Sequence, residues 1–486
     1  MKSLANILQH VTTLFERGDT GVQIAGIAFD SRAVQPGYAF VAIAGTQVNG
    51  HEFIGKAVAQ GASAIIYQFD IEIDATVCAV QVADSAEALG LMACNWYGHP
   101  SRQLKLVGVT GTNGKTTVAT LLHSTFTELG YKAGLLSTVE NKIGTEVLPS
   151  THTTPDALAI NRLMAQMVEK GCTHAFMEVS SHAIHQRRVA GLDFDGAIFT
   201  NISHDHLDYH GSFENYIHAK KMLFDTLPAG AFSLVNADDK RGKVMVQNTR
   251  SRISTYSVQT AATFRGRLIA NTLQGLQMEV NGKEVWFQLV GEFNAYNLLC
   301  VFGAAVLLGE SEEEVMLVLS ASKPVRGRFE RIPLQSGAVA IVDYAHTPDA
   351  LQNVLETVKS MQLSGEQLIT VVGCGGNRDK AKRPVMAQVA AKMSTQVVLT
   401  SDNPRNEDPK AIIQEMLDGV PLSKRRNVAV IEDREAAIRE AIAMAQTADV
   451  VLIAGKGHET YQEVNGVKHP FDDRIKVLET QNLIHP

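Results

Sequence analysis

The chain has few cysteines, no long apolar run and no excess of positive charge. Its five cysteines, among 486 residues, are scattered and form no Cys-x-x-Cys pair, so we expect neither a disulfide framework nor a cysteine-rich metal site. No stretch reaches the roughly 18 consecutive apolar residues of a membrane-spanning helix. The 44 lysines and arginines stand against 51 acidic residues, a net charge of −7, which argues against nucleic-acid or membrane-surface binding.

The few cysteines, the lack of long apolar runs and the negative net charge are typical of a cytoplasmic protein. The amino terminus becomes polar at Gln9 and His10, without the apolar core of a signal peptide. We therefore expect a cytoplasmic monomer with small-molecule partners, reduced cysteines and no membrane insertion. At roughly 150 residues per domain, the length of 486 residues corresponds to about three domains.

Apolar segments that alternate with helical patterns predict an α/β fold. Residues 1–88 mix short apolar segments with glycine turns, which favours a small α/β domain. Residues 89–332 predict a central domain with a mainly parallel sheet and a β-rich appendage, with turns at Asn271 and Asn281-Gly282. Residues 333–486 predict a Rossmann-like domain. The strands expected in the two larger domains are 104–109, 133–137, 174–179, 196–200 and 232–236, then 338–342, 367–372, 396–400, 428–431 and 449–454.

A glycine-rich segment between an apolar run and a helical pattern predicts a phosphate-binding loop. Glycines let backbone N–H groups point at phosphate oxygens, Lys115 can reach the β and γ phosphates, and Thr116 can ligate Mg²⁺. The segment has Val109 where the pattern G-x-x-x-x-G-K-[ST] has glycine. A glycine turn without phosphate function is the alternative, but the flanking strand and helix favour an ATP site in a central P-loop ATPase domain. This site comprises Gly111, Thr112, Asn113, Gly114, Lys115, Thr116 and Thr117.

Two further strand ends in the central domain carry polar groups. Glu178 is a candidate Mg²⁺ ligand because sheets of this kind present ligand-binding groups at the carboxyl ends of their strands. A surface glutamate is the alternative. The segment 204–210 holds three histidines and two aspartates, too polar for a core. A zinc site is possible there, but without a cysteine or an H-E-x-x-H helix we favour a histidine that helps to hold a second divalent ion.

Charged groups also follow several strands of the last domain. Arg378 lies in a glycine loop and Arg405 at the next strand end, and paired arginines favour carboxylate recognition because guanidinium binds carboxylate in a bidentate fork. Glu459 could receive an ammonium group, so the loops together predict a pocket for a zwitterionic amino acid. A surface salt bridge is the alternative for each one. Asp343, after the first strand, could contact a nucleotide ribose.

Six segments in this order and spacing resemble the Mur ligases of peptidoglycan synthesis, and they span nearly the whole chain. They are Thr110-Gly-Thr-Asn-Gly-Lys-Thr116, Glu178-Val-Ser-Ser-His182, Asn201-Ile-Ser-His-Asp-His-Leu-Asp208, His218-Ala-Lys220, Gly291-Glu-Phe-Asn-Ala-Tyr-Asn297 and Arg326-Gly-Arg-Phe-Glu330. Within the family, four further segments resemble enzymes that add the third residue of the stem peptide: Asp30-Ser31-Arg32, Asp343-Tyr-Ala-His-Thr-Pro348, Asp402-Asn-Pro-Arg405 and Gly455-Lys-Gly-His-Glu459. The resemblance implies a UDP-sugar domain, an ATP domain and an amino-acid domain, with UDP-N-acetylmuramoyl-L-alanyl-D-glutamate as substrate.

The resemblance also implies residue roles, position by position. Catalysis would depend on Lys115, Glu178, His206 and Lys220. Mg²⁺ would be held by Thr116, Glu178, His206 and Lys220, the last as a carbamate derived from CO₂. From periodicity alone, Lys220 and Lys221 indicate only a solvated helix face. The nucleotide would also contact Asn294, Asn297, Arg328 and Asp343. The UDP-sugar and its peptide would contact Ser31, Thr46, Gln47, Val48, Thr153, Thr154, Ser180, Gln186 and Arg188. The incoming amino acid would contact Arg378, Asp402, Asn403, Pro404, Arg405, Gly455 and Glu459.

The Asp-Asn-Pro-Arg motif resembles that of enzymes that add meso-diaminopimelate. This amino acid has a second carboxylate that lysine lacks, so lysine would leave Arg405 and Arg378 unpaired. The implied reaction uses ATP to phosphorylate the D-glutamyl γ-carboxylate, and the amine then attacks the acyl phosphate to form an amide. It would supply peptidoglycan precursor for the cell wall, and hence for cell shape and division. The alternatives are another Mur ligase, a folylpolyglutamate synthase, or a nucleotide-dependent binding or regulatory protein.

Overall fold

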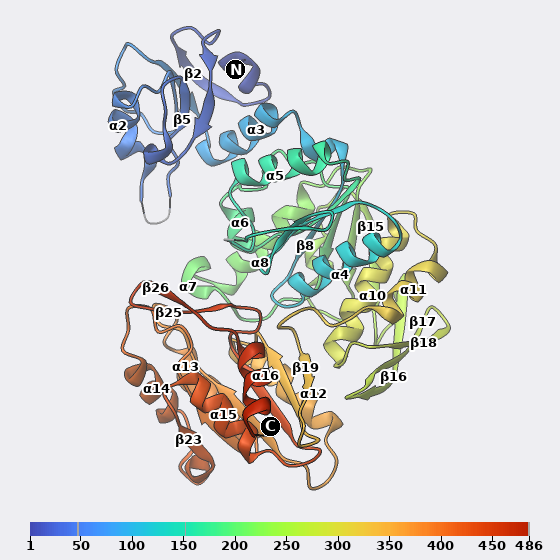
Figure 1. Ribbon diagram of the computed structural model, residues 1–486. Helices are drawn as coiled ribbons and strands as arrows, with labels where there is room; N and C mark the ends of the chain where they lie inside the picture. Colours follow the sequence, from blue (N-terminus) through green and yellow to red (C-terminus); the bar gives the residue numbers. More distant parts are fainter. Residues whose placement is uncertain (46–47, 151, 485–486) are drawn as a thin grey trace.

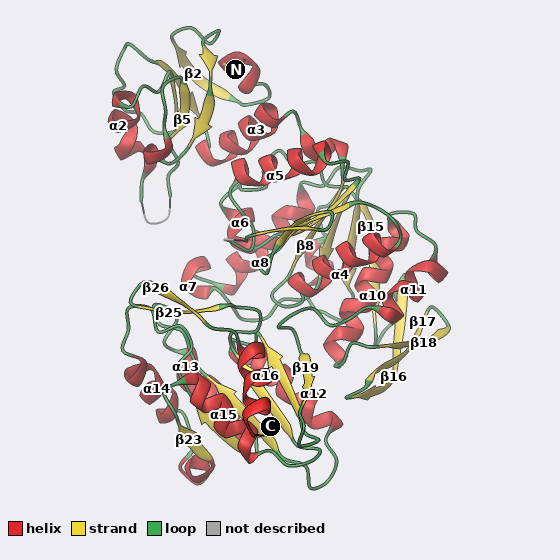
Figure 2. Ribbon diagram, in the orientation of Figure 1, coloured by secondary structure: helices red, strands yellow, loops and turns green. Residues whose placement is uncertain are grey.

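The computed structural model describes residues 1–45, 48–150 and 152–484, which form three successive units (Figure 1). In each unit helices pack against a β-sheet (Figure 2), which confirms the predicted α/β class. Across these described ranges, none of the helices combines the length and apolar character that a membrane span needs. All five cysteines are buried free thiols, as expected.

The N-terminal unit contains a five-stranded sheet in the order β2-β7-β6-β5-β4 and a small β1-β3 pair. Its strands are β1 (Lys2–Ser3), β2 (Thr13–Arg17), β3 (Gln23–Ile24), β4 (Gly26–Ala28), β5 (Tyr38–Val41), β6 (Ala64–Tyr67) and β7 (Cys78–Val82). Its helices are α1 (Leu4–Ile7), η1 (Ser31–Ala33), η2 (Gly50–Phe53), α2 (Ile54–Ala59) and α3 (Ser85–Tyr97). Helix α3 buries Leu89 and Met92 in one core with Leu4 and Val80. The expected boundary at residue 88 falls inside this helix, so we propose that the domain extends to Tyr97.

The central unit is built on an eleven-stranded sheet in the order β11-β10-β9-β12-β8-β13-β14-β15-β16-β17-β18. Its first strands are β8 (Lys105–Thr110), β9 (Ala133–Leu136), β10 (Asn141–Ile143), β11 (Glu146–Leu148), β12 (His174–Glu178), β13 (Gly196–Phe199) and β14 (Phe232–Asn236). All five strands expected here are present. They could be predicted because strands of a parallel sheet that is covered on both faces are continuous apolar runs.

Two layers of helices cover the central sheet. One face packs against α4 (Lys115–Glu128), α10 (Glu292–Leu307) and α11 (Glu312–Ala321), and the other against α5 (Ala157–Glu169), α6 (Ser181–His185), α8 (Phe213–Asp225) and α9 (Gly242–Met245). Two short helices, η3 (Pro100–Gln103) and α7 (Leu207–His210), complete the unit.

The β-rich appendage continues the central sheet with β15 (Arg252–Ser257), β16 (Phe264–Thr272), β17 (Gly275–Val280) and β18 (Lys283–Phe287). Asn281 and Gly282 have φ values of 46° and 83°, the left-handed conformations of a tight hairpin turn, as predicted. The turn expected at Asn271 is wrong, because Asn271 pairs with Leu276 within the hairpin. Its side-chain oxygen instead accepts from the Gly291 N–H at 3.0 Å and fixes the start of α10.

The C-terminal unit contains a six-stranded sheet in the order β19-β20-β24-β21-β22-β23, parallel from β20 onward. Its strands are β19 (Glu330–Pro333), β20 (Val339–Asp343), β21 (Leu368–Val372), β22 (Gln396–Leu399), β23 (Val428–Val430) and β24 (Val450–Ala454), with a separate hairpin of β25 (Tyr461–Val464) and β26 (Val467–Pro470). Its helices are α12 (Pro348–Met361), α13 (Lys382–Met393), α14 (Pro409–Asp418), η4 (Leu422–Asn427), α15 (Arg434–Met444) and α16 (Asp473–Ile484). Strand β19 crosses the boundary expected at residue 332, so we propose that this domain begins before Glu330.

The two parallel sheets bring the polar strand ends together. Strand β8 lies between β12 and β13, and the register pairs Glu178 with Val109 and Phe199 with Thr110. In the C-terminal sheet β24 lies between β20 and β21, and Ala454 pairs with both Asp343 and Val372. The loops that follow these strands therefore share one edge of each sheet, where α/β proteins bind ligands.

Candidate active site

The phosphate loop fits closely against neighbouring segments. A Cβ atom on Gly111 would lie 1.9 Å from Thr200 Oγ1, and one on Gly114, which has a φ of 87°, would lie 2.7 Å from Asn297 Oδ1. Gly114 begins helix α4 without a side-chain cap, so the first N–H groups of the helix are left for phosphate oxygens. Lys115 Nζ donates to the carbonyl oxygens of Gly111 at 2.9 Å and Thr112 at 2.8 Å. Burial lowers its pKa.

Glu178 is a buried carboxylate beside this loop. Its side chain is almost fully buried, which excludes the surface alternative. One carboxylate oxygen accepts from Thr116 Oγ1 at 3.0 Å, and the other accepts from the Thr138 N–H at 2.7 Å. The hydroxyl of Thr116 and the carboxylate of Glu178 thus present adjacent oxygen atoms, the ligand type that Mg²⁺ prefers.

His206 lies next to a second histidine. It precedes α7 with a φ of 53°, and its ring centroid is 4.8 Å from that of His182. Burial lowers the pKa of His182 to about 4, so this ring is neutral at physiological pH. His206 is more exposed and lies 3.5 Å from Asp205, and the pKa of its ring is also lowered; a neutral imidazole is the form that ligates metals. In the part of the chain that the structure describes, no group of three or more His, Cys, Asp or Glu side chains is arranged to hold a metal ion. The zinc alternative therefore has no such ligand set there.

The solvated helix face expected around Lys220 is wrong. Lys220 is 1% exposed, its Nζ donates to the Gly111 carbonyl at 2.8 Å, and it lies 4.7 Å from the centre of the Tyr216 ring. Burial, followed by the charge of Lys115, holds its pKa well below the ordinary value. A neutral amine is the form that reacts with CO₂, so the environment suits a carbamate. Lys221 is also buried and pairs with Asp225 at 2.6 Å.

The residues expected to hold the muramoyl peptide form a connected network beside Glu178. Thr154 Oγ1 donates to the Glu178 carbonyl at 2.8 Å and accepts from the Ser180 N–H at 3.1 Å. Arg188 donates to the Thr154 carbonyl at 2.8 Å and to Gln186 Oε1 at 2.7 Å. Thr153 Oγ1 lies 3.1 Å from Thr138 Oγ1.

The residues expected to bind the UDP-sugar are in the N-terminal unit. Ser31 begins η1 between the paired side chains of Asp30 and Arg32. Val48 is an exposed residue in the loop after β5. Thr46 and Gln47 lie outside the described residues.

Arg328 joins the C-terminal unit to the phosphate loop. Its Nη2 donates to Thr116 Oγ1 at 3.0 Å, and its guanidinium carbon lies 4.5 Å from the centre of the Tyr344 ring. Its Nε is buried without a partner in the described residues, as expected of a cation placed to receive an anionic ligand. Asp343 accepts from the N–H of Phe329 at 2.7 Å, and burial raises its pKa.

The two asparagines of α10 lie on the same side of the loop. Asn297 Nδ2 donates to Asn294 Oδ1 at 3.0 Å, while Asn294 donates to the Val290 carbonyl at 2.7 Å. Asn297 also lies against Gly114. The two asparagines are therefore next to the phosphate loop, although they are about 180 residues further along the chain.

The residues expected to bind the incoming amino acid lie close together in the C-terminal unit. A Cβ atom on Gly375 would lie 2.9 Å from Arg405 Nη1 and 3.9 Å from Arg378 Cγ, so the two arginines flank one glycine. Asn403 Nδ2 donates to Glu459 Oε2 at 2.7 Å. Asp402 and Gly455 are also adjacent, because a Cβ on Gly455 would lie 2.6 Å from Asp402 Oδ2. Pro404 joins these groups, and its carbonyl lies against Gly376.

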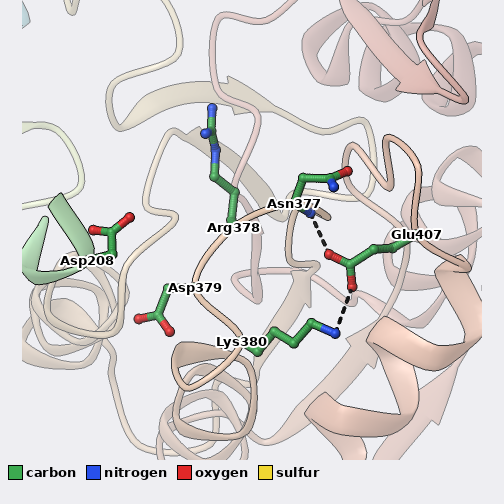
Figure 3. Close-up of a pocket in the computed structure, with 6 residues that line it drawn as sticks. All are labelled: Asp208, Asn377, Arg378, Asp379, Lys380 and Glu407. Atoms are coloured by element: carbon green, nitrogen blue, oxygen red, sulfur yellow. Dashed lines mark hydrogen bonds and ion pairs between the residues drawn. The ribbon is translucent and has the colours of Figure 1, made fainter. Parts of the chain in front are cut away.

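An open cavity of about 550 Å³ separates this unit from α7 of the central unit. Figure 3 shows Asp208 facing Arg378 and Asp379 across it, with the Arg378 side chain directed away from Glu407. The lining residues are Asp208, Asn377, Arg378, Asp379, Lys380 and Glu407. This mixture of carboxylates and cations suits a zwitterion.

Three residues of this region were missed by sequence reasoning. Lys456 is fully buried and donates to Glu459 at 2.9 Å and Asn403 at 3.1 Å. Arg383 is fully buried under the loop that holds Arg378. Tyr209 accepts from Gln186 at 3.0 Å. In the sequence, only the position of Lys456 between two glycines pointed to a special role for it. Nothing in the sequence pointed to Arg383 or Tyr209, because their partners are remote in the chain.

Comparison with known proteins identifies family models along most of the chain. Residues 23–97 match the Mur ligase family catalytic domain, residues 109–305 the Mur ligase middle domain and residues 327–457 the Mur ligase glutamate ligase domain. These three matches correspond to the three units of the fold.

Curated relatives are similar over nearly their full length. A protein of Cytophaga hutchinsonii named UDP-N-acetylmuramoyl-L-alanyl-D-glutamate--2,6-diaminopimelate ligase is 55% identical over 98% of this chain and 98% of its own. A protein of the same name from Bacteroides thetaiotaomicron is 51% identical over 99% of this chain and 100% of its own.

Solved structures share the fold. One of a UDP-N-acetylmuramoyl-L-alanyl-D-glutamate--2,6-diaminopimelate ligase superposes with a TM-score of 0.70 at 33% identity and covers 100% of both chains. The MurF ligase of Thermotoga maritima in complex with ADP has a TM-score of 0.61 at 18% identity and covers 95% of this chain and 97% of its own.

Proposed function

Since this chain belongs to the Mur ligase family, we propose that it joins 2,6-diaminopimelate to UDP-N-acetylmuramoyl-L-alanyl-D-glutamate, with ATP as the energy source, in peptidoglycan precursor synthesis. The curated relatives named for this reaction match the chain almost from end to end. The geometric observation that carries the proposal is the hydroxyl of Thr116, which contacts both Glu178 and Arg328. It supports a phosphoryl-transfer site closed by the C-terminal unit.

In the first step, an oxygen of the D-glutamyl γ-carboxylate attacks the γ-phosphorus of ATP, and ADP leaves with the electrons of the broken P–O bond. Lys115, the N–H groups at the start of α4 and Arg328 would stabilise the charge on the phosphates. Asn294, Asn297 and Asp343 would orient the nucleotide. The network of Thr154, Ser180, Gln186 and Arg188 would place the carboxylate beside Glu178.

In the second step, the free amine of the amino acid attacks the acyl carbon, the amide forms, and inorganic phosphate leaves as one proton is lost. Arg378 and Arg405 would bind carboxylates of the acceptor, and Glu459 would receive an ammonium group. The Glu459 carboxylate is held in place by hydrogen bonds from Asn403 and Lys456. Lysine lacks the second carboxylate, so a site built on two arginines would bind it less well.

The residues around the loop also fit Mg²⁺. Thr116, Glu178 and neutral His206 would hold the ion, and Lys220 would add an anionic oxygen once its neutral amine had reacted with CO₂ to form a carbamate with loss of a proton. Bound there, Mg²⁺ would neutralise phosphate charge. The UDP-sugar would contact Ser31 and the loop 46–48. We further propose that the protein acts as a monomer in the cytoplasm, where ATP is supplied.

The test is phosphate release from ATP and UDP-N-acetylmuramoyl-L-alanyl-D-glutamate with meso-diaminopimelate, with L-lysine and with no acceptor. We expect release with diaminopimelate and little with lysine. Equal or faster turnover with lysine would contradict the specificity. Release that needs no acceptor would favour a nucleotide-dependent regulatory protein. Silence with both acceptors would favour another Mur ligase or a folylpolyglutamate synthase.

A further inference from the structure

Arg378 and Arg405 are on different loops, and one buried arginine lies beneath both. Arg383, at the start of α13, is fully buried. Its Nη1 donates to Glu407 Oε2 at 3.0 Å and to Glu415 Oε2 at 2.7 Å, and its Nη2 donates to Glu407 Oε1 at 3.0 Å and to the Gly375 carbonyl at 3.3 Å. Glu407 is therefore held in the bidentate arrangement that fixes a carboxylate most firmly.

Glu407 connects the two arginine loops. It lies two residues after Arg405, and its Oε1 also accepts from the N–H of Asn377, the neighbour of Arg378, at 2.5 Å. Lys380 Nζ lies 3.5 Å from its other oxygen. Figure 3 shows this carboxylate between Asn377 and Lys380 at the wall of the cavity.

The backbone on both sides of this contact is in an uncommon conformation. Asn377 has a φ of 53° and Arg405 a φ of 52°, in the left-handed region. Such residues persist where surrounding contacts hold them. The loops also lie against one another, since Gly376 donates to the Asn403 carbonyl at 2.9 Å and Arg405 Nη1 donates to the Gly376 carbonyl at 2.8 Å.

Glu407 does not act as a proton carrier. Its hydrogen bond to Arg383, followed by that to the Asn377 N–H, lowers its pKa to about 2. It is a permanent anion at physiological pH, and its oxygens are taken up by protein donors, so its effect on the substrate passes through the loops it joins.

We infer that Glu407, fixed by Arg383, is a positioning residue that sets the separation of Arg378 and Arg405 and thereby favours an acceptor with a second carboxylate. The inference rests on the proposed function, because it assigns those arginines to the acceptor. Bidentate recognition tolerates only small errors in the position of a guanidinium group. A change at Glu407 therefore acts on the acceptor, whereas the phosphate loop, which lies in another unit, is untouched.

The matched pair Glu407→Gln and Glu415→Gln tests this inference. Each substitution removes one of the carboxylates on Arg383, but only Glu407 contacts the Arg378 loop. For Glu407→Gln we expect KM for diaminopimelate to rise by about 10-fold or more, and the ratio of kcat/KM for diaminopimelate over lysine to fall by a similar factor. KM for ATP should stay within about twofold, and Glu415→Gln should change none of these values by more than that.

Equal behaviour of the two variants would overturn the inference. So would a parallel rise of KM for ATP in Glu407→Gln, because that result indicates a general loss of structure. If Glu407→Gln does not fold, as judged by thermal melting, Arg383→Lys keeps the charge but loses the bidentate fork, and should give a smaller change in the same direction. Wild-type protein without diaminopimelate-dependent phosphate release would contradict the proposed function itself.

Discussion

The phosphate loop and the proposed amino-acid pocket differ in how their enclosed positive charges are paired. Lys115 and Lys220 both donate to the carbonyl oxygen of Gly111, and neither forms an ion pair with a carboxylate among the residues that the structure describes. In the C-terminal unit each buried cation has an acidic partner, as Arg383 has Glu407 and Lys456 has Glu459.

The difference in pairing has consequences for what each site can bind. Lys220 is fully buried and Lys115 partly so, and the pKa values of both are lowered by desolvation, so a phosphate or carbamate that supplies negative charge is favoured. Paired cations are already neutralised, and a buried pair fixes geometry more than it adds stability. We therefore propose that the first site recognises charge and that the second recognises the spacing of charges.

The largest effect should follow from the loss of charge at the phosphate loop. Lys115→Ala should lower acceptor-dependent phosphate release by roughly 10²–10³-fold, because one preorganised group is removed from the developing charge. KM for diaminopimelate in the residual activity should change little. The control is Lys105→Ala at the start of β8, the strand that leads into the loop, where an exposed lysine is paired with Asp195; this variant should be near normal. Normal turnover of Lys115→Ala would contradict the view that the phosphate loop depends on the charge of Lys115.

A smaller loss should distinguish the two adjacent lysines of α8. Lys220→Ala should lower turnover by roughly 10–100-fold, with partial recovery on addition of acetate or formate, because a short carboxylate can replace the carbamate. Lys221→Ala, which removes only the pair with Asp225, serves as the control and should retain most activity. Full activity of Lys220→Ala would show that this amine has no catalytic role.

The smallest effect concerns acid stability. Burial lowers the pKa of His174 in the central sheet from 6.5 to about 4, so between these values the unfolded chain binds more protons and stability falls as the pH falls. For Glu407 the pKa of about 2 lies below the ordinary 4.5, so its contribution is present above 4.5 and is lost only as the pH falls toward 2. The loss of stability that comes from His174 should therefore appear at a higher pH than the loss that comes from Glu407.

The measurement is Tm as a function of pH for wild type and His174→Phe. The phenyl ring keeps the contacts with Phe126 and Tyr131, at 4.6 and 4.7 Å between ring centroids, but cannot titrate. The variant should lose fewer degrees than wild type between about pH 6.5 and 4. Parallel curves would show that this histidine does not contribute to the acid sensitivity.

Local chemistry made much of the phosphate site predictable. Glycines at 111 and 114, followed by Lys115 and Thr116, form a contiguous motif whose function depends on the backbone of a few residues. The position of Glu178 at a strand end was also visible in the sequence. Its burial was not, because that depends on Thr138 and Thr116, which are on other segments.

The sequence by itself determined the α/β class, the strands of the two parallel sheets, the phosphate loop and the glycines of its turns, because hydrophobic periodicity and backbone conformation are local properties. Only the tertiary structure decided that Lys220 is buried, that Arg328 reaches Thr116 across 212 positions, and that Arg383 lies beneath two arginine loops. Burial and charge pairing depend on which segments pack together, and the chain order of these residues does not contain that information.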